Sequence, residues 1–174
     1  MRYDKLVALA AEKKPDVLIE VGMHRGNNAK RLKAHCKIYF GLDLWEAGNE
    51  ETDKRESNGK GRSTKVQAAE ALVGARFELI AGDTRQTLKA LYERGVLADF
   101  VFIDGGHSVE TIASDWKWIS QMLKAGAVVV FDDHYTPERP GFGCNSIVAR
   151  IEHELLDGDT FNGTLIRLVK YVHP

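Results

Sequence analysis

The stretch FIDGGHSVETIASDW, residues 102–116, decides the fold because an apolar run stops at an aspartate and two glycines, and a helical pattern follows. A charged carboxylate left buried without a partner destabilises a fold. Asp104 is therefore expected where a buried strand ends. Beyond it, Ile112, Trp116 and Ile119 recur at the spacing of an amphipathic helix.

The same succession of strand and helix is repeated along the chain. Apolar runs rich in β-branched and aromatic residues predict strands buried on both faces at 17–21, 38–42, 77–81, 100–103 and 128–131. Helices are predicted between and after them, at 27–35, 63–73, 84–94, 109–123 and 145–156. This order predicts an α/β fold: a doubly wound, Rossmann-like, mostly parallel sheet with helices on both faces. A turn at 157–163 and an antiparallel edge strand at 164–172 are predicted to close the chain.

Length and composition describe an ordinary globular protein. The 174 residues suit a single domain over 1–174, with an N-terminal helix at 1–15. The polar segment 46–62 reads as a loop that is either a solvated insertion or a lid over a substrate. The net charge of -1 gives no reason to expect a nucleic-acid partner.

Cysteine usage and hydropathy suggest a cytoplasmic location. Cys36 and Cys144 lie far apart and form no metal-binding or disulfide pattern, as expected in a reducing compartment. We expect neither secretion nor membrane insertion, because no signal-peptide pattern and no run of about 18 apolar residues occurs.

Acids mark the ends of the five predicted parallel strands. They are Glu20, Asp43, Asp83, Asp104, Asp132 and Asp133. Any one of them could simply cap the next turn or helix. Together they predict a shared crevice at the carboxyl edge of the sheet, where their mutual repulsion requires a cationic or hydroxyl-rich ligand.

The first strand-to-helix turn, EVGMHRGNNA at residues 20–29, places two glycines four residues apart. Glycine there lets the backbone approach a ligand closely. The turn lacks both the dinucleotide-binding fingerprint and the P-loop pattern, so a bare polyphosphate is not the expected ligand.

These residues resemble the class I S-adenosylmethionine (SAM)-dependent methyltransferases over nearly the whole chain. The pattern E-x-G-x-x-x-G at 20–26 resembles their first motif, and the resemblance implies cofactor contacts from Glu20, Gly22, Met23, Gly26, Asp43, Leu44, Asp83, Thr84 and Asp104. Asp43 would hold the ribose hydroxyls, and Asp83 would lie near the adenine amine. Leu44 would pack on the adenine face, with Trp45 as the alternative. The sulfonium, ammonium and diol groups of SAM are suitable partners for such carboxylates.

Residues 99–134 are similar to a branch of small methyltransferases that includes macrocin-type and cephalosporin-type O-methyltransferases, and the order of acids resembles catechol O-methyltransferase. The resemblance implies a Mg²⁺ site at Asp104, Asp132 and Asp133, although asparagine is usual at the last position. Magnesium prefers such oxygen ligands and would activate a substrate hydroxyl. Alternatively, the paired aspartates form a turn, and Asp104 faces the cofactor.

Two histidines are candidates for the base that removes the hydroxyl proton. His107 follows Asp104 in the loop above the crevice, and together they form the expected catalytic pair. His134 lies beside the paired aspartates and is the rival. Either can instead be a loop histidine with a local hydrogen bond.

The resulting hypothesis is Mg-assisted O-methylation of a small hydroxylated substrate such as a sugar, an antibiotic or another metabolite. One alternative is an N- or nucleic-acid methyltransferase, but base-modifying families usually carry Asn/Asp-Pro-Pro-aromatic where this chain has IDGGH. A second alternative is a non-catalytic SAM-binding subunit. The short chain leaves little material for a substrate pocket, which suggests a homo-oligomer.

Overall fold

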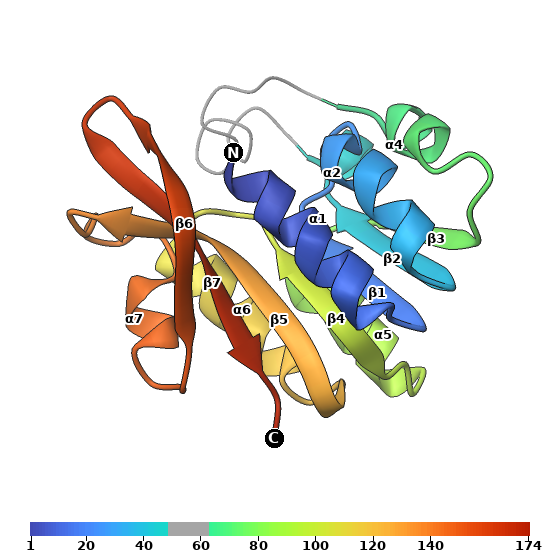
Figure 1. Ribbon diagram of the computed structural model, residues 1–174. Coiled ribbons are helices and arrows are strands. Elements are labelled where there is room, and N and C mark those ends of the chain that lie inside the picture. The colour runs from blue at the N-terminus through green and yellow to red at the C-terminus, as the bar shows by residue number, and fades with distance from the viewer. Residues whose placement is uncertain (49–62) are drawn as a thin grey trace.

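The computed structural model describes residues 1–48 and 63–174, and its core is a seven-stranded sheet between two layers of helices (Figure 1). The strands are β1 (Val17–Val21), β2 (Ile38–Asp43), β3 (Phe77–Ala81), β4 (Ala98–Ile103), β5 (Leu123–Thr136), β6 (Glu154–Phe161) and β7 (Thr164–Val172). Their order is β3-β2-β1-β4-β5-β7-β6. Strands β1 to β5 are parallel, and β7 and β6 follow as antiparallel neighbours. The predicted fold class is confirmed.

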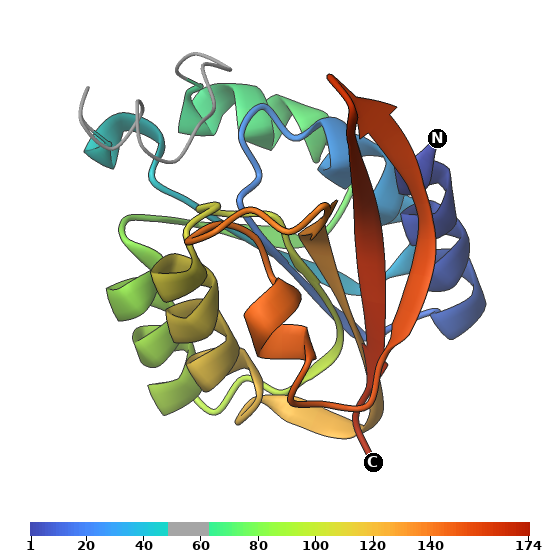
Figure 2. The same cartoon turned by 90° about the vertical axis from the view of Figure 1, so that its left-hand side faces the viewer.

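Helices cover both faces of the sheet, as the view in Figure 2 makes clear. One layer contains α1 (Arg2–Lys13), α2 (Asn27–Leu32) with the 3₁₀ turn η1 (Lys33–His35), and α4 (Lys65–Ala71). The other contains α5 (Thr84–Glu93), α6 (Val109–Ile119) and α7 (Asn145–Val148). The turn η2 (Trp45–Ala47) follows β2, and the predicted loop at 46–62 lies outside the described residues from 49 onward. No helix of the described residues is long and apolar enough to cross a bilayer.

The two core layers explain why the central strands are continuously apolar. In β4, Val101 and Ile103 pack into the layer under α5 and α6, whereas Phe100 and Phe102 pack into the layer under α1. Successive strand side chains point to opposite faces, so both sets must be apolar when both faces are covered.

The region after β5 differs from the prediction. The helix predicted at 145–156 ends at Val148, and most of the turn predicted at 157–163 belongs to β6. Strand β7 is antiparallel as predicted, but β6 covers it and forms the edge of the sheet. The reason is the Asn162–Gly163 turn, where φ angles of 47° and 78° suit a two-residue hairpin. The Asn-Gly pair is visible in the sequence and is a local signal for this hairpin.

A close backbone crossing holds the ends of β1 and β4 together. Gly22 has φ of +87°, and a Cβ atom added there would lie 2.0 Å from the carbonyl oxygen of Asp104. The amide of Gly22 donates to the carbonyl of Leu42 at 2.8 Å, and the amide of Asp104 donates to that of Val21 at 2.8 Å. Glycine is therefore required at position 22 by contact as well as by conformation.

We predict that Gly22→Ala destabilises the protein far more than Gly74→Ala. Gly74 has nearly the same φ, +86°, but nothing lies within 4 Å of its added Cβ. The control should lose about 1 kcal/mol from its left-handed backbone alone. Gly22→Ala should lose at least about 3 kcal/mol, because the Asp104 backbone must also move. Urea unfolding measures both values, and equal losses would refute the steric argument.

Candidate active site

The six acids predicted at the strand ends lie at or near the carboxyl ends of β1 to β5, which form the upper edge of the sheet in Figure 1. They are called the rim acids below. Parallel strands bring their carboxyl ends together in this way. The acids nevertheless have different surroundings, and these differences define the site.

Glu20 lies beneath the rim rather than in it. Its side chain is buried, and it accepts a hydrogen bond from the hydroxyl of buried Tyr39. Burial raises the pKa of Glu20 from 4.5 to about 8, and the charge of Asp43 acts in the same direction. The neighbouring Met23 is also buried, with its sulfur packed where a side chain on Gly41 would be. Both residues support the glycine turn from below.

The turn after β1 is tied to the end of β2. Gly26, with φ of 77°, is the N-cap of α2. The Asp43 carboxylate accepts a hydrogen bond from the His24 amide at 2.6 Å, and the Trp45 indole donates to the His24 carbonyl at 2.9 Å. Trp45 is buried by this contact, whereas Leu44 stays partly exposed. Asp43 and Leu44 thus lie beside the turn.

Asp83 caps the next helix at the same edge. Its carboxylate accepts a hydrogen bond from the Arg85 amide at 3.0 Å and forms an ion pair with the Arg85 guanidinium. Thr84 is the first residue of α5. The side chain of Asp83 remains 34% exposed, so solvent reaches it at this edge of the sheet.

Asp104, His107 and Asp133 converge in one cluster, with one ligand atom from each within 4.8 Å of the others. Nε2 of His107 lies 3.3 Å from Oδ2 of Asp133, and both side chains are buried. The amide of Gly143 donates to the His107 carbonyl at 2.8 Å, and that of Cys144 donates to the Asp133 carbonyl at 3.1 Å. The segment before α7 therefore holds the two residues together.

A bulge in β5 contains the two neighbouring aspartates. The pairing of β5 with β7 shifts between Phe131 and His134, and Asp133 has φ of 65°. Such a bulge redirects side chains. Burial raises the pKa of Asp133, and the charge of Asp132 adds to this, while His107 opposes it.

Asp132 faces the N-terminal helix instead of the cluster. Its Oδ2 accepts hydrogen bonds from the Tyr3 hydroxyl at 2.7 Å and from Nη2 of Arg2 at 3.0 Å. Burial, followed by the charges of Asp104 and Asp132, raises the pKa of Tyr3. Of the three predicted metal ligands, Asp104 and Asp133 are brought together with His107, while Asp132 is held by α1. Sequence reasoning missed Arg2 and Tyr3, because no local pattern links them to a strand 130 residues away.

His134, the rival base, lies outside the cluster. Its Nε2 is 3.4 Å from Nδ2 of Asn145. Burial lowers the pKa of His134, and its electrostatic interactions with His153 and Arg167 lower it further. The structure thus places only His107, of the two candidates, with Asp104 and Asp133.

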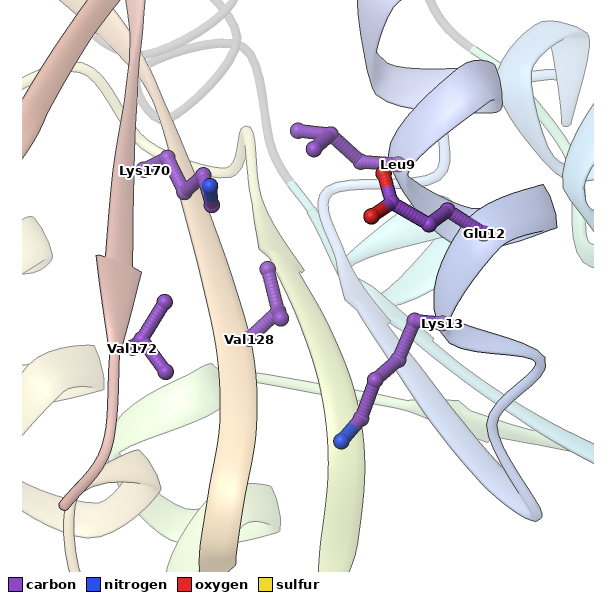
Figure 3. A pocket seen from close by; sticks show the side chains of 6 residues that line it. All are labelled: Leu9, Glu12, Lys13, Val128, Lys170 and Val172. Atoms are coloured by element: carbon purple, nitrogen blue, oxygen red, sulfur yellow. The ribbon is translucent and has the colours of Figure 1, made fainter.

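A separate hollow of about 310 Å³ lies between α1 and the first half of β5 (Figure 3). It is lined by Leu9, Glu12, Lys13, Val128, Lys170 and Val172. These residues lie toward the opposite ends of α1 and β5 from Arg2 and Asp132. None of the rim acids lines this hollow, so it is not part of the candidate site.

A family model described as Methyltransferase domain matches residues 19–134. The match runs from β1 to the end of the acidic pair on β5, and so contains every predicted site residue. No curated protein matches the chain.

Several solved structures share the fold. The O-methyltransferase TomG from Streptomyces achromogenes, in complex with SAM, has a TM-score of 0.71 and 20% identity over 99% of this chain and 79% of that one. An O-methyltransferase from Bacillus cereus, in complex with SAH, has a TM-score of 0.72 and 14% identity over 99% and 80%. The N-methyltransferase NodS from Bradyrhizobium japonicum WM9 has a TM-score of 0.68 and 16% identity over 99% and 94%. At these identities the likeness establishes the fold.

We predict that Glu20→Gln weakens the pH dependence of stability. Between about pH 5 and about pH 8 the folded protein keeps a proton on Glu20 that the unfolded chain has released. Raising the pH should therefore destabilise the wild type by up to about 4 kcal/mol more than the variant. Urea unfolding at both pH values measures this. Glu70→Gln, at an exposed position on α4, is the control, and its free energy of unfolding should change with pH as that of the wild type does. If the free energy of unfolding of Glu20→Gln also changes with pH as in the wild type, Glu20 is not protonated in the folded protein.

Proposed function

The chain belongs to the Methyltransferase domain family and is a SAM-dependent methyltransferase, and we propose from this premise that it methylates a hydroxyl oxygen of a small molecule. The observation that carries the proposal is the convergence of Asp104, His107 and Asp133 at the carboxyl edge of the sheet. An imidazole supported by a carboxylate is suited to removing a hydroxyl proton. The O-methyltransferases of similar fold are consistent with this acceptor.

The donor would bind along the turn between β1 and α2. Gly22 and Gly26 both have positive φ and carry no side chain that would block a ligand. Asp43 would accept hydrogen bonds from the ribose hydroxyls, and Leu44 would pack on the adenine. Asp83 would face the adenine amine. Glu20, being buried and protonated at neutral pH, would support the turn without facing the cofactor directly.

The proton would be accepted by His107. Asp133 faces Nε2 of His107 at 3.3 Å. A carboxylate in this position would favour the tautomer with the proton on Nε2, and Nδ1 would then be the atom that accepts the substrate proton. Burial of the pair excludes water and holds the ring in one orientation. SAM, when bound, would supply the methyl group for in-line transfer from its sulfonium to the oxygen that His107 has deprotonated.

The divalent cation that the resemblance implies fits this donor set. Mg²⁺ is commonly held by one or two carboxylates, with waters and substrate oxygens completing its shell. Asp104 and Asp133 supply two carboxylates within the 4.8 Å cluster. A cation bound there would lower the pKa of the substrate hydroxyl.

We predict that Asp43→Ala weakens binding of S-adenosylhomocysteine on the order of a hundredfold, because two charge-assisted hydrogen bonds to the ribose are lost. Isothermal titration calorimetry measures the affinity. Asp157→Ala, at an exposed position of β6, is the matched control and should bind as the wild type does. Unchanged binding by Asp43→Ala would remove the ribose assignment, and a wild type without affinity would overturn the proposed cofactor.

We predict that His107→Gln lowers methyl transfer by about a hundredfold or more and leaves S-adenosylhomocysteine affinity unchanged, because only the base is removed. The glutamine amide can still donate to Asp133, which keeps the loop in place. The assay follows label from SAM into catechols, sugars, amines and short nucleic acids.

The control for this assay is His153→Gln, which changes an exposed histidine that contacts the Ile151 carbonyl. It should retain wild-type activity. Label that enters only amines or nucleic acids would contradict an oxygen acceptor. Binding of S-adenosylhomocysteine without transfer to any acceptor class would favour a non-catalytic subunit.

A further inference from the structure

The first turn of α1 reaches into the acidic edge and forms a closed network there. Arg2 donates to Asp132 at 3.0 Å, Tyr3 donates to the same oxygen at 2.7 Å, and Arg2 donates to the Tyr3 hydroxyl at 2.9 Å. The Asp132 side chain is 1% exposed and that of Arg2 14%. The Arg2 guanidinium, the Tyr3 hydroxyl and the Asp132 carboxylate therefore contact one another away from solvent. Such charge-assisted hydrogen bonds are strong when the groups are desolvated together.

Asp132 has little capacity left for another ligand. Its second oxygen, Oδ1, accepts the amide of Asp133 at 2.8 Å. The network is also anchored from outside, because the Arg2 amide donates to Asp159 of β6 at 3.1 Å, and the Tyr3 ring packs edge-on against Phe102 with centroids 6.3 Å apart. To coordinate a cation, Asp132 would have to break a buried ion pair, which is strongly unfavourable.

We infer that Arg2 and Tyr3 are positioning residues that hold Asp132 out of the cation site, so that the ion is bound by Asp104 and Asp133 without it. The inference rests on the proposed function, since it concerns the divalent cation of that site. It changes the expected ligand set, because Asp132 becomes the counter-ion of Arg2 and is no longer a metal ligand. The N-terminal helix α1 thereby becomes part of the active site.

The charge of Arg2 also sets how tightly the ion binds. A guanidinium next to the acidic cluster opposes a divalent cation, and it cancels the charge of Asp132. Removal of Arg2 alone should therefore tighten cation binding, because repulsion is lost and Asp132 is released. Removal of Arg2 and Asp132 together leaves the net charge unchanged and should restore the original affinity.

The test is Mn²⁺ affinity, measured by electron paramagnetic resonance on the full chain, for the wild type, Arg2→Met, and Arg2→Met with Asp132→Asn. We expect Arg2→Met to bind Mn²⁺ roughly tenfold more tightly than the wild type. The double variant should bind within about twofold of the wild type. Arg2→Lys, which keeps the charge, should also remain close to the wild type.

The matched control is Arg31→Met, which removes an arginine that pairs with Asp4 of α1 at 2.6 Å but is exposed and does not contact Asp132. Its Mn²⁺ affinity should not change. Should Arg2→Met fail to fold, Tyr3→Phe tests the same release, because it keeps the ring against Phe102 and removes only the hydroxyl. It should tighten Mn²⁺ binding by about twofold.

Three outcomes would overturn the inference. The first is no Mn²⁺ binding by the wild type, and the second is unchanged Mn²⁺ affinity in Arg2→Met or its substitute Tyr3→Phe. The third is loss of Mn²⁺ binding in the double variant, which would make Asp132 a ligand. Binding of S-adenosylhomocysteine is measured on the same samples. If it is retained while the Mn²⁺ result is negative, only the positioning role fails; if it is absent from the wild type, the methyltransferase proposal fails as well.

Discussion

The carboxyl edge of the parallel sheet gathers six acidic side chains, and the need to compensate their charge organises the structure around them. Burial raises the pKa of Glu20 to about 8 and so favours its protonated form, although the hydrogen bond from the Tyr39 hydroxyl acts in the opposite direction. Asp132 is compensated by an ion pair with Arg2 and a hydrogen bond from Tyr3. These two deeply buried acids are therefore compensated within the protein, and in the proposed function they support the site and do not take part in the chemistry.

The bulge in β5 gives two consecutive aspartates opposite roles. An undistorted strand would already point Asp132 and Asp133 to different faces, and the left-handed backbone of Asp133 adds a change of direction. Asp132 meets the layer containing α1, and Asp133 meets His107 together with the segment before α7. Both helix layers thus contribute to one site, which depends on the packing of the whole sheet.

In the proposed mechanism, the methyl donor and the proton acceptor lie at the ends of separate strands. The glycine turn after β1 and Asp43 at the end of β2 form the part suited to SAM, while His107 follows β4 and Asp133 lies on β5. The crossing of Gly22 over the Asp104 backbone fixes the distance between these two parts. A rigid separation of this kind is what in-line methyl transfer requires, because donor and acceptor must be aligned before reaction.

The sequence by itself determined the order of strands and helices as far as β5, the glycine turn after β1 and the positions of the rim acids. These features are local: they depend on side-chain periodicity, on glycine where the backbone must be left-handed, and on where an apolar run ends. The Asn162–Gly163 hairpin was equally local, and its turn chemistry was sufficient to predict β6.

Only the tertiary structure decided which acids share a site and which are compensated elsewhere. The partners of Asp132 lie at the other end of the chain, and the choice of His107 over His134 depends on a bulge and on amides from the segment before α7. No local pattern specifies these contacts. They arise because packing brings distant residues together, and burial then makes each charge depend on the particular group that faces it.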